Sequence, residues 1–211
     1  MKSLYEVEEY IKEITDFSKS LDKEFLCGKN IAISGTTGLI CSYLIDSLLI
    51  DETFDIKIIA LVLTLEDGKS RFRKYVNDKR LVFVVANIVN PIHIDGAVDY
   101  VIHGASYTDP KGYAEHPIDT MLINFNGVKN MLDLAVEKKS TKLLFMSTCE
   151  IYGEADIDSI PEDYTGNSTQ WMFAVVITKA KGLARLFVFV IRKKKESLLL
   201  FQGLVDVLAL R

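Results

Sequence analysis

The sequence has few cysteines and no surplus of basic residues. Its three cysteines, Cys27, Cys41 and Cys149, lie far apart without metal-type spacing, so we expect reduced thiols in a cytoplasmic protein and no metal site. A net charge of −4 argues against a nucleic-acid partner. The late apolar runs 183–191 and 198–210 are shorter than the ~20 residues of a membrane span, so no membrane partner is expected. Acidic and apolar residues alternate over 1–25, which is typical of neither a signal nor a transit peptide.

The most informative stretch is 30–49. Ile31–Ala32–Ile33 predicts a strand buried on both faces, Gly35 and Gly38 predict a tight turn, and apolar residues then recur at helical spacing. A strand, a glycine turn and a helix together present backbone N–H groups and a positive helix end to a pyrophosphate. Cys41 stands where a third glycine is usual, so we expect the helix to dock slightly displaced. The alternative interpretation is a turn that binds nothing.

The rest of the chain alternates between strand and helix patterns. We expect one amphipathic helix over 3–26 that packs on the core as a lid, and further helices within 67–80 and over 117–138. Strands are expected at 56–63, 81–86, 98–103 and 142–146. This pattern predicts an α/β fold, a Rossmann-type doubly wound parallel sheet with an N-terminal helical extension. The second strand has no carboxylate near its end before Glu66, so the sequence does not decide between NAD and NADP.

Several segments together resemble the NAD-dependent epimerase/dehydratase family, the extended short-chain dehydrogenases that act on nucleotide sugars. They are ISGTTGLI, VDYVIHGAS, NFNGVKNMLDLA and STCEIYGE, in this order between about Lys29 and Asn167. HGAS followed by DP, then Tyr113, Pro117, Asn124 and the later PEDYTGN, look most like the UDP-glucuronate decarboxylases.

The resemblance implies an enzyme that oxidises sugar C4 with bound NAD through a transient 4-keto intermediate, followed by decarboxylation, dehydration or epimerisation. Thr148 would hydrogen-bond the C4 oxygen, and Glu150 would position the ring or handle a proton; alternatively, the two only cap a turn. A nucleotide sugar is the implied substrate. The resemblance also implies a set of cofactor-binding residues: Gly35, Thr37, Gly38, Leu39, Ile40, Asn87, Ile88, His103, Gly104, Ala105, Asn124 and Ser147.

Three of these residues differ from simple cofactor contacts in the role that we expect. Asn87 stands where the family usually has an Asp that contacts adenine. His103 fits a packed residue at a strand end better than a catalyst. Asn124 is expected to brace the loop after the fifth strand.

The resemblance stops after about Asn167. The family's Tyr-x-x-x-Lys helix, whose Tyr is the base and whose Lys lowers the Tyr pKa, does not follow, and no tyrosine occurs after Tyr164. Residues 171–211 carry eight basic against two acidic residues, whereas 1–170 carry 17 against 27. Because the degenerate codons of 174–186 permit the family's Tyr-x-x-x-Lys segment in another frame, we hypothesise a frameshift near 168–173. The alternatives are buried strands of a genuine variant or a membrane-surface hairpin.

We therefore expect an N-terminal helical extension (1–27), an NAD-binding Rossmann domain (28–170) and an atypical tail (171–211). A complete sixth strand and the C-terminal sugar-binding part are expected to be missing. Two functions remain open: a nucleotide-sugar enzyme, or an inactive nucleotide-binding remnant or regulatory module. Members of the family often form homodimers partly through the Tyr-x-x-x-Lys helix, so dimerisation is in doubt here.

Overall fold

A parallel sheet forms the centre of the molecule. The computed structural model describes residues 3–106, 115–147, 161 and 205–208. Six parallel strands lie in the order β3-β2-β1-β4-β5-β6. The order reverses between β1 and β4, and in open α/β sheets this reversal opens a crevice at the carboxyl ends of the strands. The strands are β1 (Lys29–Ser34), β2 (Ile56–Val62), β3 (Leu81–Val85), β4 (Tyr100–His103), β5 (Lys142–Met146) and β6 (Val205–Leu208).

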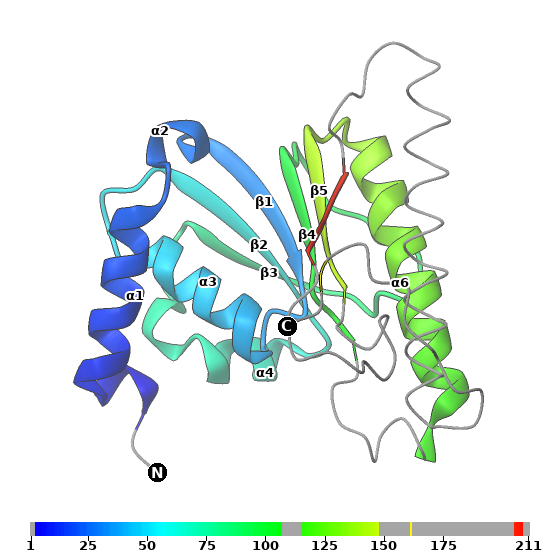
Figure 1. The fold of residues 1–211 in the computed structure, drawn as a ribbon, viewed down its shortest axis with the longest axis horizontal. Helices are drawn as coiled ribbons and strands as arrows, with labels where there is room; N and C mark the ends of the chain where they lie inside the picture. The colour runs from blue at the N-terminus through cyan, green and yellow to red at the C-terminus, as the bar shows by residue number, and fades with distance from the viewer. Residues whose placement is uncertain (1–2, 107–114, 148–160, 162–204, 209–211) are drawn as a thin grey trace.

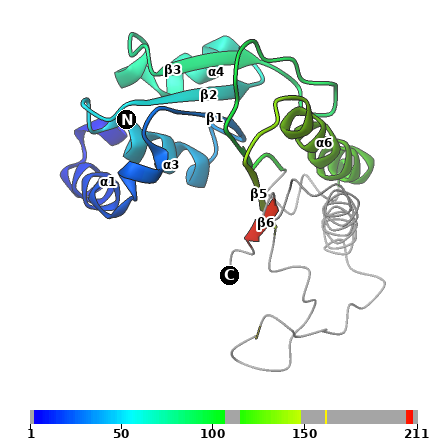
Figure 2. The same ribbon diagram turned by 90° about the horizontal axis from the view of Figure 1, so that it is seen from above.

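Helices cover both faces of this sheet (Figures 1 and 2). On one face lie α3 (Leu39–Leu49), α4 (Leu65–Arg71) and the 3-10 turn η2 (Arg73–Tyr75). The opposite face is covered by the long helix α6 (Pro117–Glu137). The expected Rossmann-type doubly wound α/β architecture is confirmed.

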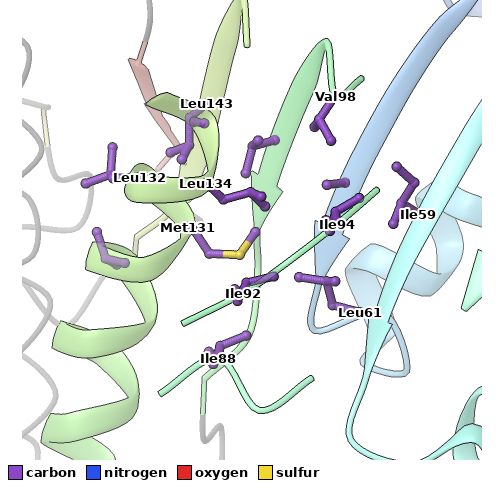
Figure 3. Close-up of a cluster of buried hydrophobic side chains, with 14 of the residues drawn as sticks. Ile59, Leu61, Ile88, Ile92, Ile94, Val98, Met131, Leu132, Leu134 and Leu143 are labelled. Atoms are coloured by element: carbon purple, nitrogen blue, oxygen red, sulfur yellow. The ribbon is translucent and has the colours of Figure 1, made fainter. Parts of the chain in front are cut away.

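The buried residues of β1 alternate between two hydrophobic clusters. Ile31 and Ile33 pack in the cluster that includes Ile45 and Leu48 of α3. Ala32 belongs to the cluster on the α6 side, drawn in Figure 3. Successive strand residues point to opposite faces, so a continuous apolar run is what a strand between two helical layers requires.

The N-terminal region differs from the single helix expected over 3–26. It consists of η1 (Leu4–Glu6), α1 (Glu8–Ser20) and α2 (Lys23–Leu26). Val7 and Leu21 have extended backbones that interrupt the helix. Asp22 then caps α2 by accepting a hydrogen bond from the backbone N–H of Phe25. Apolar spacing continued across these breaks, which is why the sequence pattern concealed them.

The sheet edge also differs from expectation. We expected no complete sixth strand, but Val205–Leu208 pairs in parallel with β5, from Leu143↔Val205 to Met146↔Leu208. The rest of the atypical tail lies outside the described residues. The other expected strands and the helix expected over 117–138 are present with ends shifted by at most two residues, and β5 has the expected bounds. The helix expected within 67–80 is instead α4 at Leu65–Arg71, followed by the short turn η2. Within the described part of the chain, no helix is both long and apolar enough to cross a bilayer.

Candidate functional site

The turn between β1 and α3 is fixed by close backbone packing. Gly35 has φ +73°, a left-handed conformation that favours glycine, and an added Cβ would lie 2.6 Å from the backbone N of Ala105. The buried Thr36 hydroxyl donates to the carbonyl of Leu61 at 3.0 Å, which ties the turn to β2. These contacts hold the glycine turn against the ends of β2 and β4.

The first turn of α3 is left open to an anion. Gly38 is its N-cap residue, and no side chain caps this end. The first turn also contains no acidic residue. Because the first N–H groups of a helix have no partner within the helix and carry partial positive charge, this end suits a phosphate group.

A cavity of about 380 Å³ lies at this edge of the sheet. Seven of the residues predicted to bind cofactor line it: Gly35, Thr37, Gly38, Asn87, Ile88, Gly104 and Ala105. Eight further lining residues were not among the predicted cofactor residues: Thr36, Leu61, Val62, Leu63, Asp67, Ala86, Ser106 and Ile123. Thr36 lies in the glycine turn itself, and the others come from the ends of β2, β3 and β4 and from α4 and α6. The folded sheet brings these residues beside the turn.

The remaining predicted residues lie elsewhere or outside the described part. Leu39 and Ile40, in the first turn of α3, are exposed but do not line the cavity, and Leu39 is 85% exposed. Ser147 is only 4% exposed, and its hydroxyl has no hydrogen-bond partner among the described residues. Buried hydroxyls are nearly always paired, so this one is notable. Thr148 and Glu150 lie outside the described residues.

His103 is a buried residue at the end of β4. Its Nδ1 lies 2.7 Å from the Ser34 Oγ, and its ring stacks on Phe145 with centroids 5.7 Å apart. A Cβ added at Gly127 of α6 would lie 3.4 Å from the imidazole. His103 does not line the cavity, and this packing agrees with a structural role for the residue.

Asn124 forms hydrogen bonds within α6 and to the segment that follows β4. Its Nδ2 donates to the carbonyl of Thr120 at 2.8 Å, and its Oδ1 accepts from the Ser106 hydroxyl at 3.1 Å. Ser106 follows β4, whereas most of the loop after β5 lies outside the described residues. The bond fixes the stretch of chain that passes from β4 along the cavity.

Cys41 replaces the third glycine without a bulky neighbour. A Cβ added at Gly104 would lie 2.4 Å from the Cys41 Sγ. Space for close packing of α3 therefore comes from Gly104, which follows β4, and not from a glycine in α3 itself. Gly104 therefore makes room for the side chain that we expected to displace the helix. Burial raises the pKa of the Cys41 thiol to about 11, which leaves it protonated at neutral pH.

A second cavity, of about 480 Å³, adjoins the first. Thr37 and Asp67 line both cavities. Part of its wall comes from η1 of the N-terminal region. Its other lining residues are Ser3, Leu4, Tyr5, Ser70, Arg71 and Arg73.

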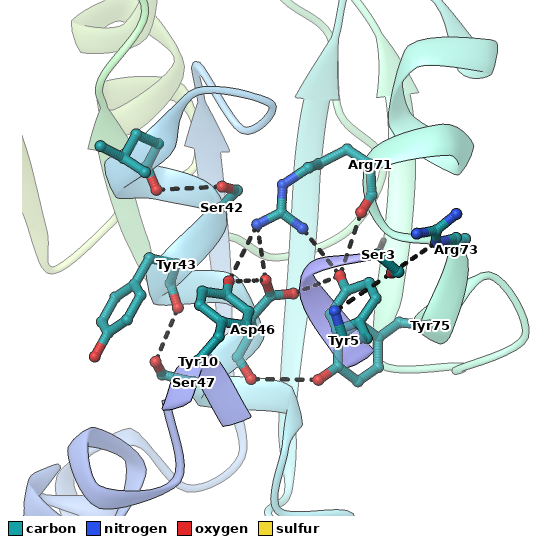
Figure 4. A network of polar contacts seen from close by, with 11 residues as sticks. Ser3, Tyr5, Tyr10, Ser42, Tyr43, Asp46, Ser47, Arg71, Arg73 and Tyr75 are labelled. Atoms are coloured by element: carbon teal, nitrogen blue, oxygen red, sulfur yellow. Dashed lines mark hydrogen bonds and ion pairs between the residues drawn. The ribbon is translucent and has the colours of Figure 1, made fainter. Parts of the chain in front are cut away.

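A buried ion pair fastens the N-terminal region to α3 and α4 (Figure 4). Asp46 is fully buried and accepts from Arg71 Nη2 at 2.8 Å. The hydroxyl of Tyr5 donates to Asp46 Oδ1 at 2.8 Å, and that of Tyr10 donates to Oδ2. Burial, reinforced by the Asp46 carboxylate, raises the pKa of Tyr5 and raises that of Tyr10 to about 12. The predicted lid is thus held by charge-assisted hydrogen bonds.

The fold and the glycine turn define a Rossmann-type α/β domain with a cavity at the point where the strand order reverses. The sequence profile of the NAD dependent epimerase/dehydratase family matches residues 31–175, and the chain belongs to this family.

Several of the curated relatives are UDP-glucuronic acid decarboxylases. The chain is 32% identical over 137 residues to UDP-glucuronic acid decarboxylase 5 of Arabidopsis thaliana, covering 65% of this chain and 39% of the relative. It is 31% identical over 139 residues to UDP-glucuronic acid decarboxylase 1 of Danio rerio, covering 66% and 32%. The chain thus spans well under half the length of these relatives.

Solved structures support the same fold. The UDP-Glc/GlcNAc 4-epimerase of Campylobacter jejuni has a TM-score of 0.67 at 18% identity, covering 86% of this chain and 53% of that one. The dTDP-glucose 4,6-dehydratase of Streptomyces venezuelae, solved with NAD bound, has a TM-score of 0.67 at 21% identity, covering 85% and 55%.

Proposed function

We propose that the chain binds NAD in the 380 Å³ cavity and belongs to a nucleotide-sugar enzyme of the UDP-glucuronate decarboxylase type. The observation that carries the proposal is the glycine turn at the reversal of strand order. Gly35 packs on the end of β4, while the uncapped first turn of α3 offers N–H groups to a pyrophosphate. In this proposal residues 28–170 form the NAD-binding domain.

The residues around the cavity suit the parts of the cofactor. The glycine turn would hold the pyrophosphate, since Gly38 brings no side chain to the start of α3. Asn87 would contact adenine beside the apolar Ile88; its Oδ1 already accepts from the backbone N–H of Val89 at 3.2 Å, which orients the amide.

Bound NAD would supply the hydride acceptor for oxidation at sugar C4. Thr148 would hold the C4 oxygen by a hydrogen bond, because a hydroxyl can donate to a ketone and accept from an alcohol. Glu150 would position the sugar ring or carry a proton. Both residues follow shortly after β5 in the sequence. The proposed substrate is UDP-glucuronate or a related nucleotide sugar, as the names of the curated relatives suggest.

A second candidate is a binding module without turnover. It is favoured by the absence of any tyrosine after Tyr164, where the family resemblance calls for a tyrosine base. Loss of a general base costs a typical enzyme about 10²- to 10⁴-fold in rate. The two candidates share NAD binding and differ only in chemistry.

One experiment separates them. The purified chain is titrated with NAD by calorimetry, then incubated with NAD and UDP-glucuronate while products are followed by mass spectrometry. NAD binding with formation of UDP-xylose supports the enzyme, and NAD binding without product supports the binding module. Absence of NAD binding refutes both.

If product forms, Thr148→Val tests the proposed catalytic hydroxyl. We expect kcat to fall about 100-fold while the Kd for NAD stays within about twofold. Thr141→Val is the matched control, since Thr141 is exposed and precedes β5. Equal kcat values for the two variants would remove Thr148 from the mechanism.

A further inference from the structure

The end of β2 has no carboxylate, but the first turn of α4 places one, that of Asp67, at the cavity. Dinucleotide-binding sheets usually have an acidic residue at the end of β2 that accepts a hydrogen bond from the adenosine ribose 2′-hydroxyl. In this chain β2 ends at Val62 and continues through Leu63 and Thr64, none of which is acidic. The first turn of α4 contains Glu66 and Asp67, and only Asp67 lines the cavity beside the glycine turn.

Asp67 lies on the wall between the two cavities. Together with Thr37 it lines both the cavity at the strand ends and the larger one beneath η1. A phosphate on the 2′-oxygen of the adenosine ribose adds about two negative charges at this wall. The charges around Asp67 therefore decide which dinucleotide the site accepts.

Local hydrogen bonds hold the Asp67 carboxylate and leave one oxygen available. The Thr64 hydroxyl caps α4 by accepting from the backbone N–H of Asp67 at 3.1 Å and donates to Asp67 Oδ2 at 2.6 Å. Oδ1 has no partner among the described residues. A carboxylate oriented in this way can accept a hydrogen bond from a hydroxyl group, since an ionised carboxylate is a hydrogen-bond acceptor only.

The neighbouring cations are already engaged with the protein. Arg71 donates Nη1 to the Tyr5 hydroxyl at 3.0 Å and Nη2 to Asp46 at 2.8 Å. Arg73 donates Nε to the Ser3 hydroxyl at 3.0 Å. Among the described residues that line the two cavities, Arg71 and Arg73 are the basic ones. Because Asp46 neutralises Arg71 and Asp67 balances Arg73, the lining carries no net positive charge for a 2′-phosphate.

We propose that the Asp67 carboxylate accepts a hydrogen bond from the 2′-hydroxyl of the adenosine ribose and thereby makes the chain bind NAD in preference to NADP. The inference rests on the proposed NAD site. Asp67 does here, from the first turn of α4, what a strand-end acid does in other dinucleotide sites.

The test compares NAD and NADP binding by calorimetry in the wild type, Asp67→Asn and Glu66→Gln. The wild type is expected to bind NAD at least about 30-fold more tightly than NADP, because the 2′-phosphate of NADP would lie beside the like-charged Asp67 carboxylate. In Asp67→Asn the ratio of the Kd for NADP to the Kd for NAD should fall by about tenfold or more, because NAD binds more weakly and NADP more tightly. Glu66→Gln removes a charge from the same helical turn without lining either cavity, and should leave the ratio unchanged.

Arg73→Gln provides the opposing test. Because Arg73 is a positive charge near the proposed 2′-hydroxyl site, we expect its removal to leave the ratio of the Kd for NADP to the Kd for NAD near that of the wild type or to raise it. Tighter binding of NADP than NAD by the wild type, or an unchanged ratio in Asp67→Asn, would overturn the role of Asp67 while leaving the NAD site intact. A wild type that binds neither dinucleotide would refute the proposed function and this inference with it.

Discussion

Gly104 and Cys41 form a pair whose sizes depend on each other. A methyl group added at Gly104 would stand 2.4 Å from the Cys41 Sγ and 3.2 Å from the Met146 Sδ. Comfortable contact between such atoms needs about 3.5 Å, so α3 or the thiol must move by about 1 Å. The backbone of Gly104 does not have a positive φ, so the penalty comes from packing alone.

We therefore predict that Gly104→Ala lowers the free energy of unfolding by about 1–3 kcal/mol, the usual cost of overpacking. Cys41→Ala should cost about 1 kcal/mol through lost packing. The double variant should be more stable than the sum of the two losses predicts, by about 1–2 kcal/mol, because the new methyl group takes the space of the missing sulfur.

The assay is urea unfolding followed by far-UV circular dichroism. Cys27→Ala serves as the control for loss of a thiol, since Cys27 is exposed and should change stability by less than about 0.5 kcal/mol. Additive effects in the double variant, or a Gly104→Ala variant as stable as the wild type, would refute the pairing.

Three further predictions concern the buried polar and thiol groups. Asp46→Asn should lower the free energy of unfolding in urea by about 3–5 kcal/mol, because it leaves the largely buried Arg71 without its counter-ion; a loss below 1 kcal/mol would contradict this. In the folded protein the pKa of Cys41 is raised to about 11 and that of Tyr10 to about 12. The protonated forms of these two side chains therefore contribute fully to stability below about pH 9, and the contribution is lost as the pH rises through 11 and 12. Thermal melts between pH 8 and 12 would detect the loss as a falling melting temperature. In a Cys149→Ser background a thiol reagent at pH 8 should label Cys27 at once and Cys41 only in denaturant, and rapid labelling of both would show that Cys41 is accessible.

The strands and helices could be predicted from the sequence because their patterns depend on residues close together in the chain. The β-branched run before Gly35 and the helical spacing after Gly38 lie within a few residues of the turn they define. Seven of the predicted cofactor residues line one cavity because the carboxyl ends of neighbouring parallel strands meet at one edge.

Features that depend on pairs of distant residues could not be read in this way. The fit of Gly104 to Cys41 and the bonds from Tyr5 to Asp46 join separate elements, and neither partner signals the other in the sequence. Asp67 was overlooked for a related reason. In dinucleotide-binding sheets the acid usually lies at the end of β2, whereas here the first turn of α4 places Asp67 at the cavity.

The most direct test of the account is a calorimetric titration of the wild-type chain and Gly38→Ala with NAD. Gly38 has ordinary backbone angles, φ −74° and ψ 163°, so alanine adopts its conformation without strain. An added Cβ would lie 3.2 Å from the Gly35 carbonyl oxygen, a tight contact that a small shift of the turn relieves, so the variant should fold with a modest loss of stability. We predict one NAD site in the wild type and at least about tenfold weaker binding in Gly38→Ala, with the melting temperature shifted by only a few degrees. No NAD binding by the wild type, or equal affinity in the two proteins, would contradict a cofactor site at the glycine turn.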